Sequence, residues 1–433
     1  MNVENLLVKW FGYDSKLTSV RTEVFAGITT FLTMAYILAV NPAVLGETGM
    51  DRGALFTMTA LVSALATLLM AVIGKLPFAL APGMGLNAFF AYTICLGLGY
   101  SWQFALTAVF IEGLIFILLT VTNLREKIVA SLAPSIRNAI SVGIGLFIAF
   151  IGLQNADIVV DSPATLVTLG NVLQGPPVLA IIGCVLTSVL LVRKVKGALL
   201  ISIVLTTLIG IPMGVTHFQG WVSTPPSIEP IFCKLEWSNI FTKDMFAIVF
   251  TLLFIDLFDT IGTIVGVCTN ARMVNPDGSI YRLRQAFLAD SISTTLGALM
   301  GSSTVTTFVE SASGVNEGGR SGLTAFTTAM CFLLALILSP FFLSVPNAAT
   351  APVLILVGVM MMGSVMTIDF SDFSEAIPAF ICIAFMPMSY SISDGIVFGH
   401  LSYVLINLLA GKYKKVSLGM VILAGFFLLK FIL

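Results

Sequence analysis

Long apolar runs separated by short polar segments dominate the chain from residue 24 onward. A helix needs about 20 mostly apolar residues to cross a bilayer, and fourteen runs approach or reach that length. The predicted spans are residues 24–43, 55–73, 84–98, 102–121, 136–154, 178–192, 198–214, 245–269, 286–300, 309–318, 322–343, 351–366, 373–387 and 393–410. A further apolar stretch, 416–432, is either an additional helix or an interfacial one. Residues 1–23 form an interfacial lead-in without a cleavable signal pattern.

Two of these spans are short, and an irregular stretch precedes each of them. Residues 76–88 hold two prolines and two glycines, and residues 301–308 are rich in Ser, Thr and Val. Such stretches favour extended backbone that leads into a half-helix. Each is the third span of a seven-span half, and because seven is odd the second half is inverted. Matching interrupted spans in inverted halves indicate a transporter binding site, whereas the alternative is two kinked helices.

Charge in the loops predicts the orientation. With alternating spans, Arg52, Lys234 and Lys243 lie on one side, Lys430 lies near the end, and the remaining 17 of the 21 basic residues lie on the other side. The positive-inside rule therefore predicts a cytoplasmic N-terminus.

Composition narrows the class further. Hydrophobic residues make up 58% and charged residues 10%, and the net charge is −1. These values exclude a protein that binds nucleic acid through basic patches and a disordered scaffold, and they indicate an all-α polytopic protein in the lipid bilayer. Six cysteines without paired spacing and only two histidines predict neither a disulfide framework nor a metal site. With no hydrolase or metalloprotease motif, we expect no enzyme.

Acidic residues inside predicted spans are costly in a membrane and each needs a reason. Asp256, Asp259 and Thr263 follow i, i+3, i+7 spacing, which places them on one helix face. Two carboxylates so close cannot both ionise cheaply, so we expect one to hold a proton. The alternative is a structural acid that bonds to a half-helix.

For the other acids and the amide at membrane depth, the sequence leaves alternative roles open. Glu310 begins the second half-helix, where it either caps that helix or faces a central cavity. Asn87, in the first half-helix, either contacts a ligand or bonds a neighbouring helix. Glu112 and Asp290 are expected to bond helices together, and Asp394 is expected to cap its span.

Carboxylates, hydroxyls and one phenylalanine, without Lys or Arg, would serve an anion poorly. They suit a neutral, flat solute that is rich in N–H donors, such as a purine base, because carboxylates accept hydrogen bonds from N–H groups and aromatic rings stack on bases. A small-anion transporter on the same architecture is the alternative from a different class.

Several long sequence segments, spread along nearly the whole chain, resemble those of a known family. They are residues 21–36, 41–42, 81–88 (APGMGLNA), 256–260 (DLFDT), 304–311 (TVTTFVES) and 314–322. The chain resembles the nucleobase/cation symporter-2 superfamily and, within it, the AzgA-like adenine/guanine/hypoxanthine permeases. The resemblance implies two short strands that cross at the site and proton-coupled purine uptake at the plasma membrane, with hypoxanthine or guanine favoured and adenine as the alternative.

The resemblance also implies a 7+7 inverted repeat divided into a core and a gate, with a possible homodimer through the gate. The core comprises residues 24–121 and 245–343, the gate comprises 122–214 and 344–411, and residues 215–244 and 412–433 form an extracellular loop and a C-terminal segment.

Residue by residue, the resemblance assigns the acid that holds the base to Asp259 and the half-helix acid to Glu310. We expect the base to contact Asp259, Glu310, Asn87, Phe308, Thr307, Ser311, Thr263 and Ala81. Asp256, Asp259 and Glu310 are expected to carry the coupling proton, and no other cofactor is expected. Related uracil permeases have histidines where this chain has Thr260 and Thr263, so their histidine-assisted proton path does not transfer.

Overall fold

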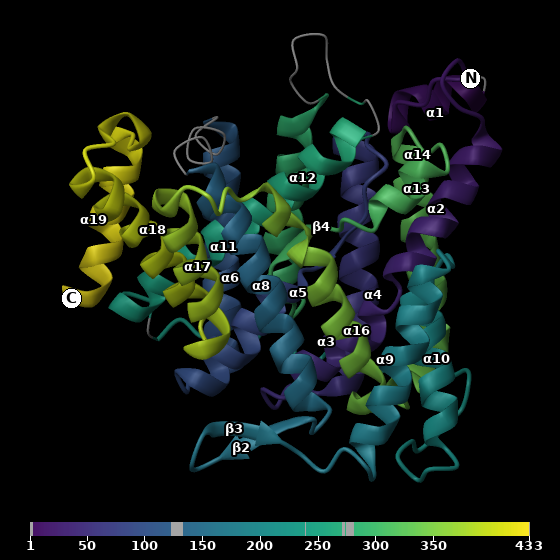
Figure 1. Ribbon diagram of the computed structural model, residues 1–433. Helices are drawn as coiled ribbons and strands as arrows, with labels where there is room; N and C mark the ends of the chain where they lie inside the picture. The colour runs from purple at the N-terminus through teal and green to yellow at the C-terminus, as the bar shows by residue number, and fades with distance from the viewer. Residues whose placement is uncertain (1–2, 123–132, 239, 271–272, 274–280, 433) are drawn as a thin grey trace.

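The computed structural model describes residues 3–122, 133–238, 240–270, 273 and 281–432 as a bundle of membrane-length helices with two small pairs of strands (Figure 1). Arg125, Lys127 and Arg272, which contribute to the predicted loop-charge asymmetry, lie outside these described residues. Each of the fourteen predicted spans overlaps one or more of the helices.

The first half begins with α1 (Val3–Phe11) and continues through seven spans. They are α2 (Val20–Met34) with α3 (Ile37–Gly46), α4 (Arg52–Leu69) with the π-helical η1 (Met70–Gly74), β1 (Leu80–Pro82) with α5 (Met84–Ala88) and the π-helical η2 (Phe89–Gly97), α6 (Trp102–Val121), α8 (Pro134–Asn155), α9 (Pro176–Val192) and α10 (Ala198–Gly210). The first span was predicted as one helix, but the structure divides it at a turn formed by Ala35 and Tyr36. The strands β2 (Val159–Ser162) and β3 (Leu166–Leu169) form a hairpin between α8 and α9.

The second half repeats this order. Its spans are α11 (Lys243–Asn270), α12 (Leu283–Leu299), β4 (Val305–Thr307) with α13 (Ser311–Asn316), α14 (Gly322–Ala335) with η3 (Leu336–Leu338) and α15 (Ser339–Leu343), α16 (Asn347–Met361) with η4 (Met362–Thr367), α17 (Phe373–Met388) and α18 (Ile392–Leu409). A strand followed by a short helix therefore occupies the third position in both halves, as predicted.

Helix packing separates the spans into two groups. The helices α2, α3, α4, α6, α11, α12 and α14 pack among themselves, and so do α8, α9, α10, α16, α17 and α18. Small residues allow close approach within a group: a Cβ added to Gly145 of α8 would lie 2.7 Å from the carbonyl oxygen of Gly358 in α16. Between the groups, α5 contacts α8, α3 contacts α16, and α2 contacts α10.

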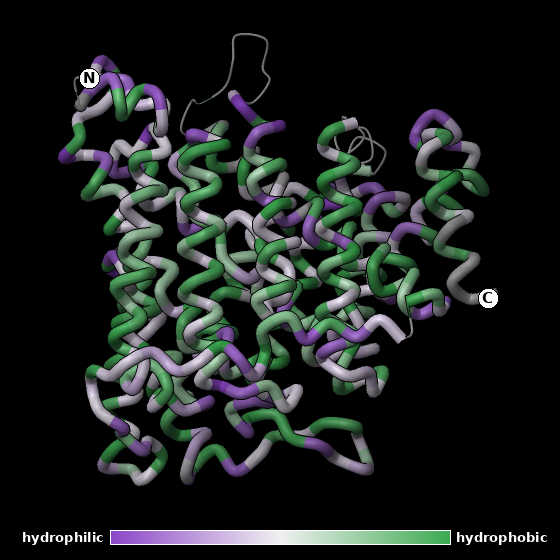
Figure 2. Tube along the Cα trace, turned by 180° about the vertical axis from the view of Figure 1, so that it is seen from behind, coloured by the Kyte–Doolittle hydropathy of each residue, from purple (hydrophilic) through white to green (hydrophobic). Residues whose placement is uncertain are grey.

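Hydropathy along the bundle fits a membrane environment. Within the described residues, seven helical segments are long and apolar enough to cross a bilayer, and four shorter apolar helices accompany them. Hydrophobic residues line the lengths of the helices, whereas hydrophilic residues gather mainly at their ends and in the loops (Figure 2).

The C-terminal apolar stretch forms a further helix after η5 (Tyr413–Lys415), namely α19 (Leu418–Ile432), beside α18 (Figure 1). The buried His400 of α18 bonds through Nε2 to the carbonyl oxygen of Met420, at 3.0 Å. The Phe427 ring packs against His400 and against Phe250 of α11, with centroids 5.4 and 5.6 Å apart. These contacts fix α19 to both α18 and α11.

Candidate functional site

The two short strands, which precede the two half-helices, pair with one another in the interior, and we call this place the strand crossing. β1 pairs antiparallel with β4, so that Leu80 faces Thr307, Ala81 faces Thr306 and Pro82 faces Val305. The pairing continues beyond the strands, because Gly83 N donates to Thr304 O and Phe308 N donates to Ala79 O, each at 3.0 Å. Non-helical backbone at membrane depth is tolerated where protein or a watery cavity surrounds it.

Neighbouring side chains satisfy backbone groups at the crossing. The Ser311 hydroxyl accepts from Ala79 N at 3.0 Å, and the Thr294 hydroxyl donates to Val305 O at 3.0 Å. The Thr67 hydroxyl lies 3.0 Å from Leu80 N and 3.1 Å from Leu80 O. Buried backbone polar groups are costly when unpaired, so these threonines and serines fix the path of the strands.

Glu310 lies directly before α13, and its side chain makes no capping bond to that helix. Its Oε1 instead accepts from the hydroxyl of Tyr36, at 2.7 Å. The Glu310 side chain is partly exposed, and no group in the described part of the chain hydrogen-bonds to its Oε2. The capping alternative is therefore not what the geometry shows, and one carboxylate oxygen remains available.

Asp259, on α11, is the second acid with an available carboxylate oxygen, and we call Glu310 and Asp259 the open acids. Its side chain is partly exposed, and its carboxylate forms no hydrogen bond or ion pair with any residue the structure describes. It lies within electrostatic range of the Glu310 and Asp290 carboxyls. Since like charges repel strongly where the dielectric constant is low, Asp259 and Glu310 together attract hydrogen-bond donors and cations and disfavour anions.

Three other acids at membrane depth are fully buried and bonded to hydroxyl groups. The Thr304 hydroxyl donates to Glu112 Oε2 at 2.5 Å. The Thr260 hydroxyl lies 3.1 Å from Asp256 Oδ1 and 3.3 Å from Asp290 Oδ2. These acids tie helices to the strand crossing, whereas the two open acids do not.

Thr260 has a special place because it also lies 2.8 Å from the Thr306 hydroxyl of β4. A hydroxyl carries a single proton, so Thr260 can donate to only one of Asp256 and Asp290 at a time. The structure thus groups Asp256 with Thr260 and Asp290, while Asp259, one turn away, lies within electrostatic range of Glu310. The sequence had placed Asp256 and Asp259 together as one pair.

Asn87 sits fully buried in α5 and bonds a loop residue rather than another helix. Its Oδ1 accepts from the Ser303 hydroxyl, and its Nδ2 has no hydrogen-bond partner among the described residues. A buried amide donor without a partner is uncommon in proteins. Asn87 therefore offers an unused NH2 group, with two N–H donors, close to the start of β4.

The remaining predicted residues lie on the same elements. Ala81, Thr307, Phe308, Ser311 and Thr263 are all buried, with Ala81 in β1, Thr307 in β4 and Thr263 in α11. The Thr307 hydroxyl has no hydrogen-bond partner in the described part of the chain, whereas that of Ser311 serves the backbone of Ala79.

Sequence reasoning missed Tyr36 and underrated Thr260. Tyr36 stands in the apolar run of the first span, and its polar hydroxyl among aliphatic neighbours was a weak signal that it needs a partner. Nothing in the sequence connects it to Glu310, which is 274 positions away.

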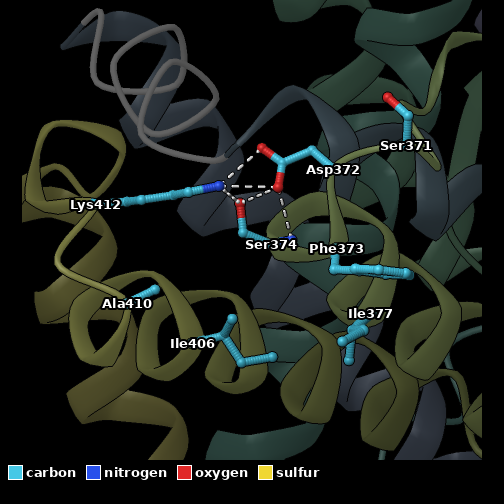
Figure 3. Close-up of a pocket in the computed structure, with 8 residues that line it drawn as sticks. All are labelled: Ser371, Asp372, Phe373, Ser374, Ile377, Ile406, Ala410 and Lys412. Atoms are coloured by element: carbon cyan, nitrogen blue, oxygen red, sulfur yellow. Dashed lines mark hydrogen bonds and ion pairs between the residues drawn. The ribbon is translucent and has the colours of Figure 1, made fainter.

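A groove of about 510 Å³ lies elsewhere, at the ends of α17 and α18 (Figure 3). Lys412 Nζ donates to Asp372 Oδ1 and to Ser374 Oγ, each at 2.9 Å, and Lys415 bonds Asp372 and Glu375 at 2.9 and 2.7 Å. The Lys415 and Lys412 ammonium groups hold the pKa of Asp372 well below its usual range. The charges of this cluster pair with one another, so it fastens the polypeptide segment after α18 to α17.

The arrangement at the strand crossing offers hydrogen-bonding groups, and no catalytic set is found among the described residues. Within the described ranges, no group of three His, Cys, Asp or Glu side chains is placed to hold a metal ion. What remains is two carboxylates with open oxygens, one amide donor and buried hydroxyls around paired strands.

Comparison with known proteins decides the family. A family model described as a permease family matches residues 21–398. The chain belongs to the nucleobase/cation symporter-2 family of permeases. It is 42% identical to the guanine/hypoxanthine permease PbuG of Bacillus subtilis, with 98% of this chain and 99% of that protein covered. It is 40% identical to the adenine permease AdeP of Escherichia coli, with 99% and 96% covered.

Solved structures show the fold. The transmembrane domain of the cyanobacterial bicarbonate transporter BicA has a TM-score of 0.65 at 14% identity, with 88% of this chain and 97% of that chain covered. The murine anion transporter Slc26a9 has a TM-score of 0.66 at 13% identity, with 92% and 70% covered. The permease therefore has the predicted 7+7 inverted-repeat fold.

Family membership settles two further points. Members are permeases, so this chain is a multi-pass membrane transporter and not an enzyme. Likeness to anion transporters at such low identity concerns the fold alone, and function depends on the residues at the site.

Proposed function

We propose that the permease imports purine nucleobases, with hypoxanthine or guanine preferred, by symport with protons. The observation that carries this proposal is the pair of open acids: Asp259 and Glu310 lie within electrostatic range of one another, and no described residue hydrogen-bonds to the Asp259 carboxylate or to Glu310 Oε2. A purine presents ring N–H groups that carboxylates accept in charge-assisted hydrogen bonds. The names of the similar permeases, for guanine/hypoxanthine and for adenine, support the same substrate class.

Asn87 complements the two acids in this proposal. Its buried Nδ2 lacks a partner among the described residues and can donate to a carbonyl or ring nitrogen of the base. Phe308, Thr307, Ser311, Thr263 and Ala81 complete the proposed lining. Hypoxanthine and guanine place an N–H beside a carbonyl, whereas adenine places an amine beside a bare ring nitrogen, so the orientation of one amide can change the preference.

Adenine is the second candidate substrate, since relatives of similar identity are named for adenine and for guanine/hypoxanthine. An anion substrate would meet two carboxylates at the site, and no Lys or Arg among the described residues forms an ion pair with either of them. The site therefore does not present the positive charge that would favour an anion, although the fold is similar to that of anion transporters.

Proton coupling is proposed to use Asp259 and Glu310 at the site and Asp256 behind it. Binding a proton between like-charged carboxylates relieves their repulsion, and a base bound by the same acids links the two events. Thr260, which bonds Asp256 and β4 through Thr306, connects this acid to the strand crossing.

We propose that transport proceeds by rocking of a core (residues 24–121 and 245–343) against a gate (122–214 and 344–411). The two packing groups support this division, because the strand crossing and both half-helices lie with the first group. Substrate sites of such transporters lie near the midplane at the repeat interface. We further propose a plasma-membrane location, a cytoplasmic N-terminus and a homodimer through the gate.

The experiment is uptake of radiolabelled hypoxanthine by cells that lack their own purine transport, with unlabelled adenine, guanine, xanthine and uracil as competitors, with and without a protonophore. Uptake that guanine blocks and the protonophore abolishes is expected. Competition by adenine alone would reassign the base, and no purine uptake by surface-expressed protein would overturn the proposal.

A further inference from the structure

Tyr36 places a phenolic hydroxyl at the strand crossing from an unexpected element. It lies in the turn that divides the first span between α2 and α3, and its side chain is only 1% exposed. Its hydroxyl donates to Glu310 Oε1 at 2.7 Å. A tyrosine buried this deeply needs a hydrogen-bond partner, and Glu310 supplies it.

The bond to Tyr36 makes the two oxygen atoms of the Glu310 carboxylate different from one another. An ionised carboxylate has two acceptor oxygens, and Tyr36 occupies one of them. The other, Oε2, has no hydrogen-bond partner among the described residues. The terminal torsion of a free glutamate is broad, so a fixed bond at Oε1 also fixes the direction in which Oε2 points.

We propose that Tyr36 is a positioning residue for substrate selection, which rests on the proposed purine site: it orients Glu310 so that Oε2 accepts one particular N–H of the base. The inference deepens the proposed function because it assigns a task to each oxygen of Glu310. Tyr36 itself does not contact the base. Removal of its hydroxyl frees the carboxylate to rotate, which weakens both the affinity for the base and the discrimination between N–H positions.

Tyr36→Phe tests the proposal because it removes one oxygen atom and keeps the buried ring. The chain offers a matched control: Tyr403 of α18 donates to Glu375 Oε1 of α17 at 3.3 Å, within the other packing group. At equal surface expression, we expect Tyr36→Phe to raise the KM for hypoxanthine about 10-fold, as for loss of a bond to a charged group. We expect Vmax to stay within about 2-fold, and Tyr403→Phe to change neither value.

A ligand panel separates positioning from a merely structural role. 1-Methyl-, 7-methyl- and 9-methylhypoxanthine each lack one N–H or block one ring nitrogen, and each is used as a competitor of hypoxanthine uptake. In the wild type, one methyl position should weaken competition most, and in Tyr36→Phe the penalty at that position should shrink. A structural defect would weaken all analogues by the same factor.

A double-mutant cycle with Glu310→Gln completes the test, by equilibrium binding of hypoxanthine to purified protein so that loss of turnover does not matter. If Tyr36 acts through Glu310, adding Tyr36→Phe to Glu310→Gln should weaken binding no further. A further 10-fold loss, or an unchanged KM and analogue pattern in Tyr36→Phe, would overturn the inference while purine uptake by the wild type stands. If the wild type moves no purine, the proposed function fails instead.

Discussion

Asp259 is an open acid, whereas Glu112 is a closed one, meaning that it is fully buried and bonded to a hydroxyl group. This difference makes a paired prediction for Asp259→Asn and Glu112→Gln. Asp259 makes no hydrogen bond with any described residue, so its amide variant loses no protein contact and is relieved of repulsion from Glu310. Its unfolding free energy should change by less than about 0.5 kcal/mol. Binding should lose a charge-assisted hydrogen bond of about 1.5–3 kcal/mol, which is a roughly 10- to 150-fold rise in KM.

Glu112→Gln should do the reverse. Its fully buried Oε2 accepts from Thr304 at 2.5 Å, next to β4. Gln at this position keeps an oxygen that can accept from Thr304, but it removes the carboxylate and brings an NH2 group into a fully buried site, where a donor without an acceptor costs about 1–3 kcal/mol. We therefore expect a loss of about 1–2 kcal/mol in stability with a KM within about 3-fold of wild type.

The assay compares both variants with the wild type by SDS-induced unfolding of purified protein and by hypoxanthine uptake at equal surface expression. Thr304→Val serves as the partner variant for Glu112, since it removes the hydroxyl and keeps the shape. The reasoning is refuted if Asp259→Asn destabilises the protein as much as Glu112→Gln, or if Glu112→Gln abolishes binding while its stability is unchanged.

Three further predictions concern other contacts. Thr260→Val, which removes the hydroxyl shared by two buried carboxylates, should flatten the pH profile of uptake, whereas Thr260→Ser should restore it; equal profiles would contradict this. Lys196 and Glu317 form a 2.6 Å ion pair between the α9–α10 loop and the end of α13, so a bifunctional thiol reagent that links cysteines placed at these two positions should stop turnover but not binding. Unimpeded uptake by the cross-linked protein would refute this. Because Lys415 lowers the pKa of Asp372, Asp372→Asn should lower the melting temperature at pH 7, less so at high salt. The difference should shrink progressively as the pH falls below about 4 and the carboxyl takes up a proton; a deficit that stays unchanged in acid would count against the ion pair.

Sequence patterns predicted the fold because its main features are local. Two prolines and two glycines within 76–88, and the Ser/Thr/Val run before Glu310, favour extended entries into short helices, and both strands form there. The break at Ala35 and Tyr36 was missed, since neither residue is a helix breaker.

The roles of the acids were harder to predict for the same reason. Spacing placed Asp256 and Asp259 on one face of α11, but the residues that separate their roles come from other segments. Thr260 links Asp256 to Asp290 of α12 and to Thr306 of β4, whereas Glu310 lies within electrostatic range of Asp259. Whether an acid is open or closed depends on which hydroxyls the other spans bring, and hydropathy carries no such information.

Proton movement driven by a purine gradient tests the central claim most directly. Purified protein is reconstituted into liposomes that contain a pH-sensitive dye, and hypoxanthine is added outside. The account predicts that the lumen acidifies as hypoxanthine enters, at a fixed ratio of protons to base, and that Asp259→Asn liposomes show neither movement. Entry of hypoxanthine without acidification, or an unchanged response in Asp259→Asn, would contradict it.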